Sequence, residues 1–159
     1  MKDIFEYIER NVEEYIADLQ LLIQQPSISA QNIGLRDCAI LVKDMMHKDG
    51  LPAELHDITN GPPLVFGHLK SSKSKKTLLC YSHYDVQPPE PIEEWSHGGP
   101  WSGALVDNII YGRGATDNKG GLLAFNKAAK TFLKVRGEVP ANVKFFYEGA
   151  EEKKLMHLG

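Results

Sequence analysis

The chain has no long hydrophobic run, only two cysteines and no excess of basic residues. No apolar stretch approaches the roughly 18 residues that a membrane span requires, so the sequence predicts no membrane partner. Lys and Arg number 18 against 21 Asp and Glu, and this balance argues against a nucleic-acid partner. Two cysteines are too few for a disulfide framework, so we expect free, buried thiols.

The composition is that of an ordinary globular protein. Its 159 residues fit one domain with a real core, and 42% are hydrophobic and 25% charged. Residues 1–6 are charged and amphipathic, unlike a secretory leader. The sequence therefore predicts a cytoplasmic protein.

Hydrophobic periodicity predicts alternating helices and strands. Helices are expected over residues 3–24, 35–48 and 118–135, strands over 53–58, 64–69, 77–81 and 143–147, a hairpin over 105–111, and a long ordered loop over 86–103. Strands early and late in the chain, with helices between them, predict an α/β sheet covered by helices.

Three short motifs carry the side chains that are best suited to chemistry. Residues 82–85 read Ser-His-Tyr-Asp, residues 112–120 read Gly-Arg-Gly-Ala-Thr-Asp-Asn-Lys-Gly, and residues 148–152 read Glu-Gly-Ala-Glu-Glu. The first and third follow apolar runs that are typical of buried strands. Sites in α/β folds form at strand ends, and zinc accepts an imidazole and carboxylates as ligands. The motifs therefore predict a metal site.

Each motif has a plainer interpretation when taken alone. His83 and Asp85 can be a surface hydrogen-bonded pair, and Asp117 can cap the following helix. The glycine-rich setting of Asp117 suggests a phosphate loop, but its spacing fits neither common pattern. Glu151 and Glu152 can be a solvated acidic pair. Together, in this order, the motifs favour a two-metal hydrolase, in which paired ions lower the pKa of a shared water and a free Glu serves as general base. A carboxylate-only glycosidase is a weaker alternative, because it gives His83 no role.

The motifs resemble those of the zinc-dependent aminoacylase and carboxypeptidase family, which includes carnosine-type dipeptidases, acetylornithine deacetylase and succinyl-diaminopimelate desuccinylase. The matching stretch runs from residues 25–29 (Gln-Pro-Ser-Ile-Ser) to Glu152, and residues 83–88 (His-Tyr-Asp-Val-Gln-Pro) are most like the dipeptidase branch. The resemblance implies an α/β fold with a mixed, mostly parallel sheet and helices on both faces. Residues 1–152 would be the front half of a zinc-exopeptidase-like catalytic domain, without the family's lid domain.

When the family's site residues are transferred one by one to this sequence, the resemblance implies two divalent metal ions. Zinc is the first expectation, and manganese and cobalt are the alternatives. His83 would bind one ion, Asp117 would bridge both, and Glu152 would bind the second. Glu151 would be the catalytic general base, and Asp85 would orient the imidazole. The peptide bond after Asp117 is expected to be cis, as it often is in the family.

Residues 153–159 (Lys-Lys-Leu-Met-His-Leu-Gly) replace the Gly-Ser step that typically follows in the family, so we expect an atypical tail. Family members continue further, with one more Asp ligand, a distal His ligand and the lid. We therefore expect a hydrolase of small peptides or N-acyl amino acids that is weak or inactive as this chain. The alternative is a non-catalytic remnant that binds a metal or a protein. Homo-oligomers are expected through an exposed sheet edge, or as the dimer of the family.

Overall fold

The computed structural model shows an α/β fold and describes residues 1–153; the predicted tail beyond Lys153 lies outside the described residues. The elements in chain order are α1 (Lys2–Arg10), α2 (Val12–Gln24), α3 (Leu35–Lys48), β1 (Glu54–His56), β2 (Leu64–Leu69), β3 (Thr77–His83), β4 (Ala104–Val106), β5 (Ile109–Tyr111), α4 (Lys119–Arg136) and β6 (Asn142–Glu148). Every predicted strand and the hairpin are present within a few residues of their expected bounds.

The first predicted helix is divided in two. Asn11 separates α1 from α2 with φ −115° and ψ 11°, and its side-chain amide donates to the backbone oxygen of Tyr7 at 2.6 Å. This side chain competes with the helical backbone pattern, which is a common property of Asn. The expectation of one continuous helix over residues 3–24 was therefore wrong at one residue.

The main sheet has the order β1-β2-β6-β3 and is mostly antiparallel. β1 pairs with β2 and β2 with β6 in antiparallel fashion, and only β3 and β6 are parallel. The prediction of a mostly parallel sheet was wrong because parallel neighbours need a crossover connection. Only the step from β3 through α4 to β6 supplies one; the links from β1 to β2 and from β2 to β3 contain no helix.

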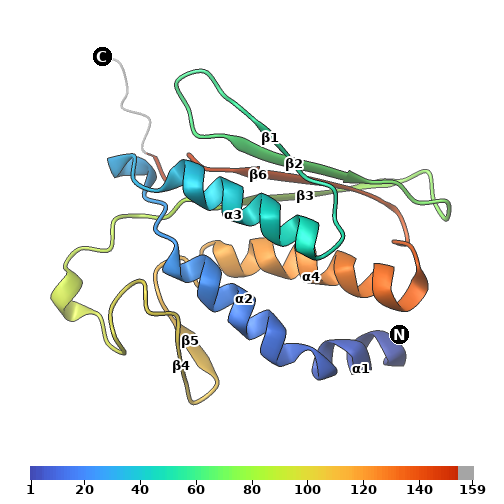
Figure 1. Ribbon diagram of the computed structural model, residues 1–159, viewed down its shortest axis with the longest axis horizontal. Helices are drawn as coiled ribbons and strands as arrows, with labels where there is room; N and C mark the ends of the chain where they lie inside the picture. The colour runs from blue at the N-terminus through green and yellow to red at the C-terminus, as the bar shows by residue number, and fades with distance from the viewer. Residues whose placement is uncertain (154–159) are drawn as a thin grey trace.

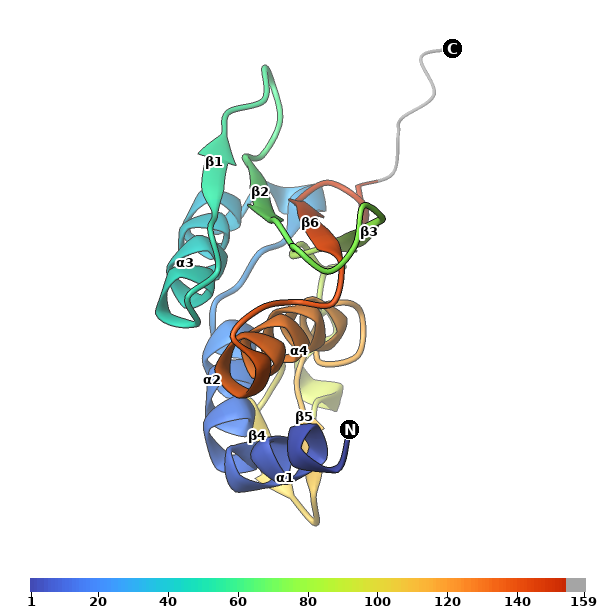
Figure 2. The ribbon, with the colours of Figure 1, turned by 90° about the vertical axis from the view of Figure 1, so that its right-hand side faces the viewer.

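All four helices lie on one side of this sheet (Figures 1 and 2). The other face carries exposed apolar side chains, with Leu79 60%, Tyr81 47% and Phe146 37% exposed. Among the described residues, the expectation of helices on both faces was therefore wrong. That expectation came from the resemblance to the family. The apolar residues that β3 and β6 place on both faces are typical of a sheet covered on two sides.

The core fills the space between the sheet and two layers of helices. α3 lies under β1 and β2, α4 lies under β3, and α1 and α2 pack against α4 from below (Figure 2). Phe145 and Tyr147 point from β6 into this core, together with Val65 of β2 and Met46 of α3. Cys38 and Cys80 are free and buried, as expected. Within residues 1–153, no helix combines the length and the apolar character needed to cross a bilayer.

The segment between β3 and the β4–β5 hairpin is ordered by side chains rather than by regular structure. The Trp95 indole donates to the backbone oxygen of Pro89 at 2.6 Å, and the Arg113 guanidinium lies 5.1 Å from the centre of the Trp95 ring. Apart from a short turn of 3₁₀ helix at Ile92–Glu94, this segment is the long ordered loop that its sequence predicts.

Candidate metal centre

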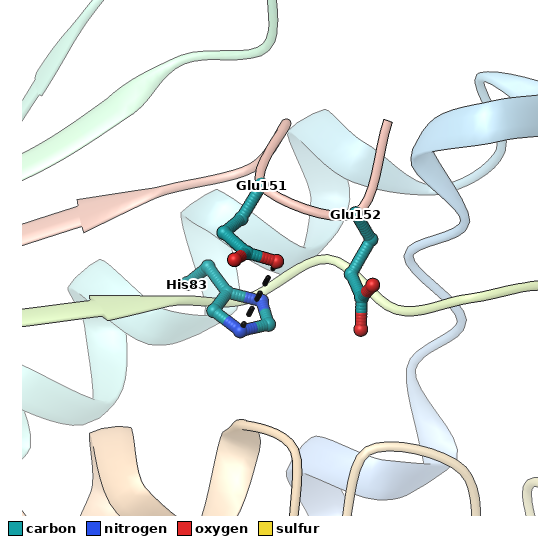
Figure 3. Close-up of side chains that lie close together, drawn as sticks. All are labelled: His83, Glu151 and Glu152. Atoms are coloured by element: carbon teal, nitrogen blue, oxygen red, sulfur yellow. Dashed lines mark ion pairs between the residues drawn. The ribbon is translucent and has the colours of Figure 1, made fainter. Parts of the chain in front are cut away.

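The parallel pair β3 and β6 brings the first and third motifs together. His83 ends β3 and is the register partner of Glu148, the last residue of β6. Because both strands run in the same direction, the residues that follow them emerge at the same edge of the sheet. Figure 3 shows the outcome: His83 faces Glu151, and Glu152 lies beside them on the same turn. Candidate ligand atoms of these three residues all lie within 4.8 Å of one another.

The second motif reaches the same point from the start of α4. Asp117 Oδ1 lies 3.1 Å from His83 Nε2, and Glu151 Oε2 lies 3.8 Å from that nitrogen. The imidazole is buried, whereas the side chains of Asp117 and Glu151 are 74% and 47% exposed. The centre therefore has a fixed, buried nitrogen at its base and carboxylates that open toward solvent.

Asp85 is fully buried and connects the imidazole to the third motif. Its Oδ1 lies 3.4 Å from His83 Nδ1, and its backbone oxygen lies 3.1 Å from the same nitrogen. Its two carboxylate oxygens also accept the backbone N–H groups of Glu151 at 3.3 Å and Glu152 at 2.9 Å. One carboxylate thus fixes both the ring orientation and the turn that carries the two glutamates.

Charges around His83 alter its proton affinity. Burial alone lowers the pKa of His83, but the hydrogen bonds and charge of Asp85, together with Glu151, outweigh burial and raise the pKa to about 9. For Asp85, burial raises the pKa, and the hydrogen bonds from His83, Ser29 and the Glu152 backbone outweigh it and lower the pKa. Without a metal, the imidazole is a cation held by its acidic neighbours. A metal ion has to displace that proton.

The plainer interpretations of the first two motifs fail. His83 is 4% exposed, so it is not part of a surface pair. Asp117 does not cap α4, because the capping position is Asn118 and no side-chain cap hydrogen bond is formed there. The cis peptide bond expected between Asp117 and Asn118 is present.

The glycines of the second motif allow close contacts within the loop. A Cβ at Gly120 would lie 2.3 Å from the backbone oxygen of Ala115. Gly114 has φ +86°, and a Cβ there would lie 2.7 Å from Val86, one residue after Asp85. The glycine density therefore serves backbone packing against the neighbouring motif, and the described contacts give no support to a phosphate loop.

Sequence reasoning missed two residues beside this centre. Gln87 donates from Nε2 to Glu152 Oε2 at 2.6 Å and to the Glu152 backbone oxygen at 3.0 Å. Lys119 is completely buried two residues after Asp117. Gln87 stands in the stretch that resembles dipeptidases, which was the only signal for it. Nothing in the sequence distinguished Lys119 from a solvated lysine.

The residues present are suited to divalent ions. One imidazole nitrogen and the carboxylates of Asp117, Glu151 and Glu152 converge, and zinc, manganese and cobalt accept such nitrogen and oxygen donors. Because Nδ1 is bonded to Asp85, Nε2, which faces Asp117, is the nitrogen that a metal would bind once its proton is lost; this is the usual arrangement of a metal-binding histidine.

Comparisons with known proteins identify the family to which the chain is similar. The family description "Peptidase family M20/M25/M40" matches residues 79–158. The mouse protein named Beta-Ala-His dipeptidase is 32% identical over 167 residues, which cover 96% of this chain and 34% of that protein. The chain thus spans about a third of the length of the curated relatives it matches.

Solved structures show the same fold over a similar fraction of their chains. Human carnosine dipeptidase 1 superimposes with a TM-score of 0.87 at 30% identity, over 99% of this chain and 36% of that one. The metallo-carboxypeptidase Sso-CP2 of Sulfolobus solfataricus is 41% identical, with a TM-score of 0.79, over 87% of this chain and 31% of that one. The described residues therefore correspond to one contiguous part of a larger architecture.

Proposed function

Because the chain belongs to peptidase family M20/M25/M40, we propose that its centre holds two divalent metal ions and hydrolyses peptide or N-acyl amide bonds. The observation that carries the proposal is the convergence of His83, Asp117 and Glu151 from three separate segments. Dipeptides are the substrates proposed first, since relatives at 30% and 32% identity are named dipeptidases. N-acyl amino acids are the second class.

In this proposal His83 and Asp117 would hold one ion, and Asp117 and Glu152 would hold the other. Zinc is proposed first, because histidine and carboxylates are common ligands of catalytic zinc. When bound, the ions supply Lewis acidity, which lowers the pKa of water and polarises a carbonyl group. Gln87 holds the Glu152 carboxylate in place through its 2.6 Å hydrogen bond.

Glu151 is proposed as the general base. Its half-exposed carboxylate takes a proton from the attacking water and returns it to the leaving amine nitrogen. Asp85 acts on the geometry: it holds the His83 ring through Nδ1 and receives the backbone N–H groups of Glu151 and Glu152. A substrate reaches the centre from the solvent side, where Asp117 and Glu151 are exposed.

We further propose that hydrolysis by this 159-residue chain alone is weak or absent. In the assignment above each ion has two protein ligands, whereas catalytic zinc sites usually keep three. Fewer ligands weaken binding and leave the position of each ion less fixed. The ligand count, and not the geometry of the three motifs, is the reason for this expectation.

Two measurements on the purified chain test the proposal. Elemental analysis after zinc loading and removal of excess is expected to give bound zinc that His83→Gln abolishes. Dipeptide hydrolysis is expected to be slow, chelator-sensitive and lost in Glu151→Gln, which removes the base and keeps the shape. No zinc binding would contradict the metal proposal, and fast chelator-resistant hydrolysis would contradict the mechanism.

A second candidate is a non-catalytic module that binds a metal or a protein. The exposed Leu79, Tyr81 and Phe146 on the uncovered sheet face favour it, because contiguous exposed apolar surface marks interaction sites. Self-association through this face or the free edge of β3 would then be expected. Light scattering discriminates: Leu79→Lys should convert oligomers to monomers if the face is an interface, and a monomeric parent chain would contradict it.

A further inference from the structure

Lys119 is a buried lysine with an unusual set of partners. It is the first residue of α4, two residues after Asp117, and its side chain is 0% exposed. Its Nζ donates to the backbone oxygens of Leu22 at 2.9 Å and Gln25 at 2.6 Å. Within residues 1–153 it forms no ion pair. The other buried lysines of α4, Lys127 and Lys130, are both paired with carboxylates.

Burying an ammonium group without a carboxylate is unfavourable unless other dipoles compensate. The two acceptors lie at the C-terminal end of α2, where Leu22 is in the last turn and Gln25 is the cap residue. Unpaired carbonyl groups there carry the negative end of the helix dipole, and a cation stabilises it. α2 has no basic residue in its own last turn, so Lys119 supplies that cation from another helix. The ring of Trp101, 5.9 Å from Nζ, adds a further favourable contact.

The same residue closes the loop that carries Asp117. Its backbone N–H donates to the Gly114 oxygen at 3.0 Å. A Cβ added at Gly114 would lie 3.4 Å from Lys119 Cγ and 2.7 Å from Val86, so the lysine stem and the segment after Asp85 both pack on this glycine. Lys119 therefore connects the Asp117 loop with the end of α2 and with the segment that carries His83 and Asp85.

We propose that Lys119 is a positioning residue for the metal centre: by capping α2, its ammonium group fixes the loop that presents Asp117 to His83. The inference rests on the proposed function, in which Asp117 binds metal. Lys119 acts through Asp117 and has no contact with the ions or the substrate in this account. Asp117 needs such support because its own side chain is 74% exposed and, within residues 1–153, is bonded to the centre through His83 alone.

The test compares Lys119→Met with Lys130→Met in the full chain. Both remove a buried ammonium group from α4 and keep the length of the stem. Lys130 pairs with Glu14 and Asp49, away from the metal centre, and each acid keeps another lysine within 3.9 Å. Urea unfolding establishes that each variant is folded at the temperature used. If Lys119→Met does not fold, Lys119→Gln, which keeps an amide donor, takes its place.

The first readout needs no metal. Backbone amides of Arg113 and Ala115 are hydrogen-bonded within or next to the loop, to Pro100 and Gly112. Lys119→Met is expected to speed their hydrogen exchange about tenfold or more through local opening, while Lys130→Met leaves their exchange near the parent rate. Unchanged exchange in folded Lys119→Met, or an equal increase in both variants, would overturn the proposal.

The second readout is the affinity and visible absorption of bound Co²⁺. Lys119→Met is expected to weaken Co²⁺ binding by about 10-fold or more and to alter the spectrum, as loss of an outer support typically does. A purely electrostatic role predicts the opposite sign, because removing a nearby positive charge favours a cation. Unchanged or tighter binding would therefore contradict the positioning role. If the parent chain binds no Co²⁺, the proposed function fails, and the exchange measurement alone decides on Lys119.

Discussion

Two clusters of acidic residues in this molecule are similarly close-packed and differ in their cations. At the end of the sheet, Glu151 and Glu152 meet His83; between the helices, Glu14, Asp18 and Asp49 lie equally close together. The helical cluster is bonded to three lysines. Lys127 contacts Asp18 at 2.5 Å and Asp49 at 2.7 Å, Lys130 contacts Glu14 at 2.6 Å, and Lys48 contacts Asp18 at 3.0 Å.

The comparison shows that proximity of carboxylates does not by itself make a metal site. Three lysines balance three acids in the helical cluster, so an added divalent ion would have to displace ammonium groups. At the sheet edge, within residues 1–153, no lysine or arginine forms an ion pair with Glu151 or Glu152. The cation paired there is the His83 imidazolium, which becomes a ligand when it loses its proton. The Glu152 carboxylate accepts a hydrogen bond from the neutral Gln87 amide, and the Glu152 backbone N–H donates to the Asp85 carboxylate. The helical cluster is thus structural and the sheet-edge cluster is open to a metal.

The largest effect should come from breaking the helical cluster. Lys127→Met leaves the buried Asp18 and Asp49 without their shared cation, and removal of one member of a buried ionic group costs about 3–5 kcal/mol. Urea denaturation should therefore show a reduced free energy of unfolding. Adding Asp18→Asn should recover part of that loss. A change below about 1 kcal/mol would contradict the buried character of the cluster.

The next effect distinguishes the two clusters by the pH range in which each contributes to folding stability. The folded-state pKa of His83, about 9, exceeds its ordinary value, so its contribution to the stability of the metal-free chain is complete below about pH 6.5. That contribution to the free energy of unfolding is on the order of 3 kcal/mol, and it is lost as pH rises through about 9. The lowered pKa values of Glu14 and Asp18 affect stability only in acid.

Unfolding in urea at pH 6 and pH 9.5, with chelator present, measures this difference. His83→Gln should show a much smaller decrease in stability between the two pH values. An equal decrease in parent and variant would show that another group is responsible.

A comparable effect distinguishes the clusters by metal. Zinc at about a hundred times its Kd should raise the free energy of unfolding by about 2.7 kcal/mol, since it binds the folded chain. His83→Gln should remove this gain, whereas Asp18→Asn, compared with its own metal-free value, should keep it. Thermal melts with and without zinc measure both. If Asp18→Asn removed the gain and His83→Gln did not, the metal would bind in the helical cluster.

The smallest effect concerns Gln87. Gln87→Ala leaves Glu152 in place and removes the donor that holds its carboxylate, so zinc affinity should fall by about 10-fold, with little change in metal-free stability. Competition with a chromogenic chelator gives the affinity. Asn11→Ala, which removes a comparable amide bond to Tyr7 at the junction of α1 and α2, is the matched control and should leave the affinity unchanged.

Local features of this fold were predictable from the sequence, and pairings were not. The bounds of α3 and β2 follow from hydrophobic spacing alone, and both agree with the structure. The direction of β2 relative to β6 depends on which strand is inserted between β2 and β3, which no local pattern records. The mostly parallel sheet was expected from the family resemblance, and no local pattern in the sequence could correct it.

The metal centre shows the same contrast between local features, which were predictable, and contacts between distant segments, which were not. The residue types and their order in the three motifs pointed to metal chemistry, and the structure brings His83, Asp117, Glu151 and Glu152 together. The double acceptance of backbone N–H groups by Asp85 was not predictable, because it depends on the three-dimensional turn after β6. Lys119 escaped notice for a similar reason: its partners are backbone oxygens, which carry no sequence signal.

The position of β6 in the middle of the sheet has a consequence for synthesis on the ribosome. β6 is the last strand in chain order, yet it lies between β2 and β3. Until residues 142–148 have left the ribosome, β2 lacks one neighbour and β3 lacks its only partner. A nascent chain therefore carries these unpaired edges until β6 emerges, and edge-to-edge aggregation is a hazard during that time. Glu151 and Glu152 emerge just after β6, so the proposed metal centre is assembled only once this period of exposure has ended.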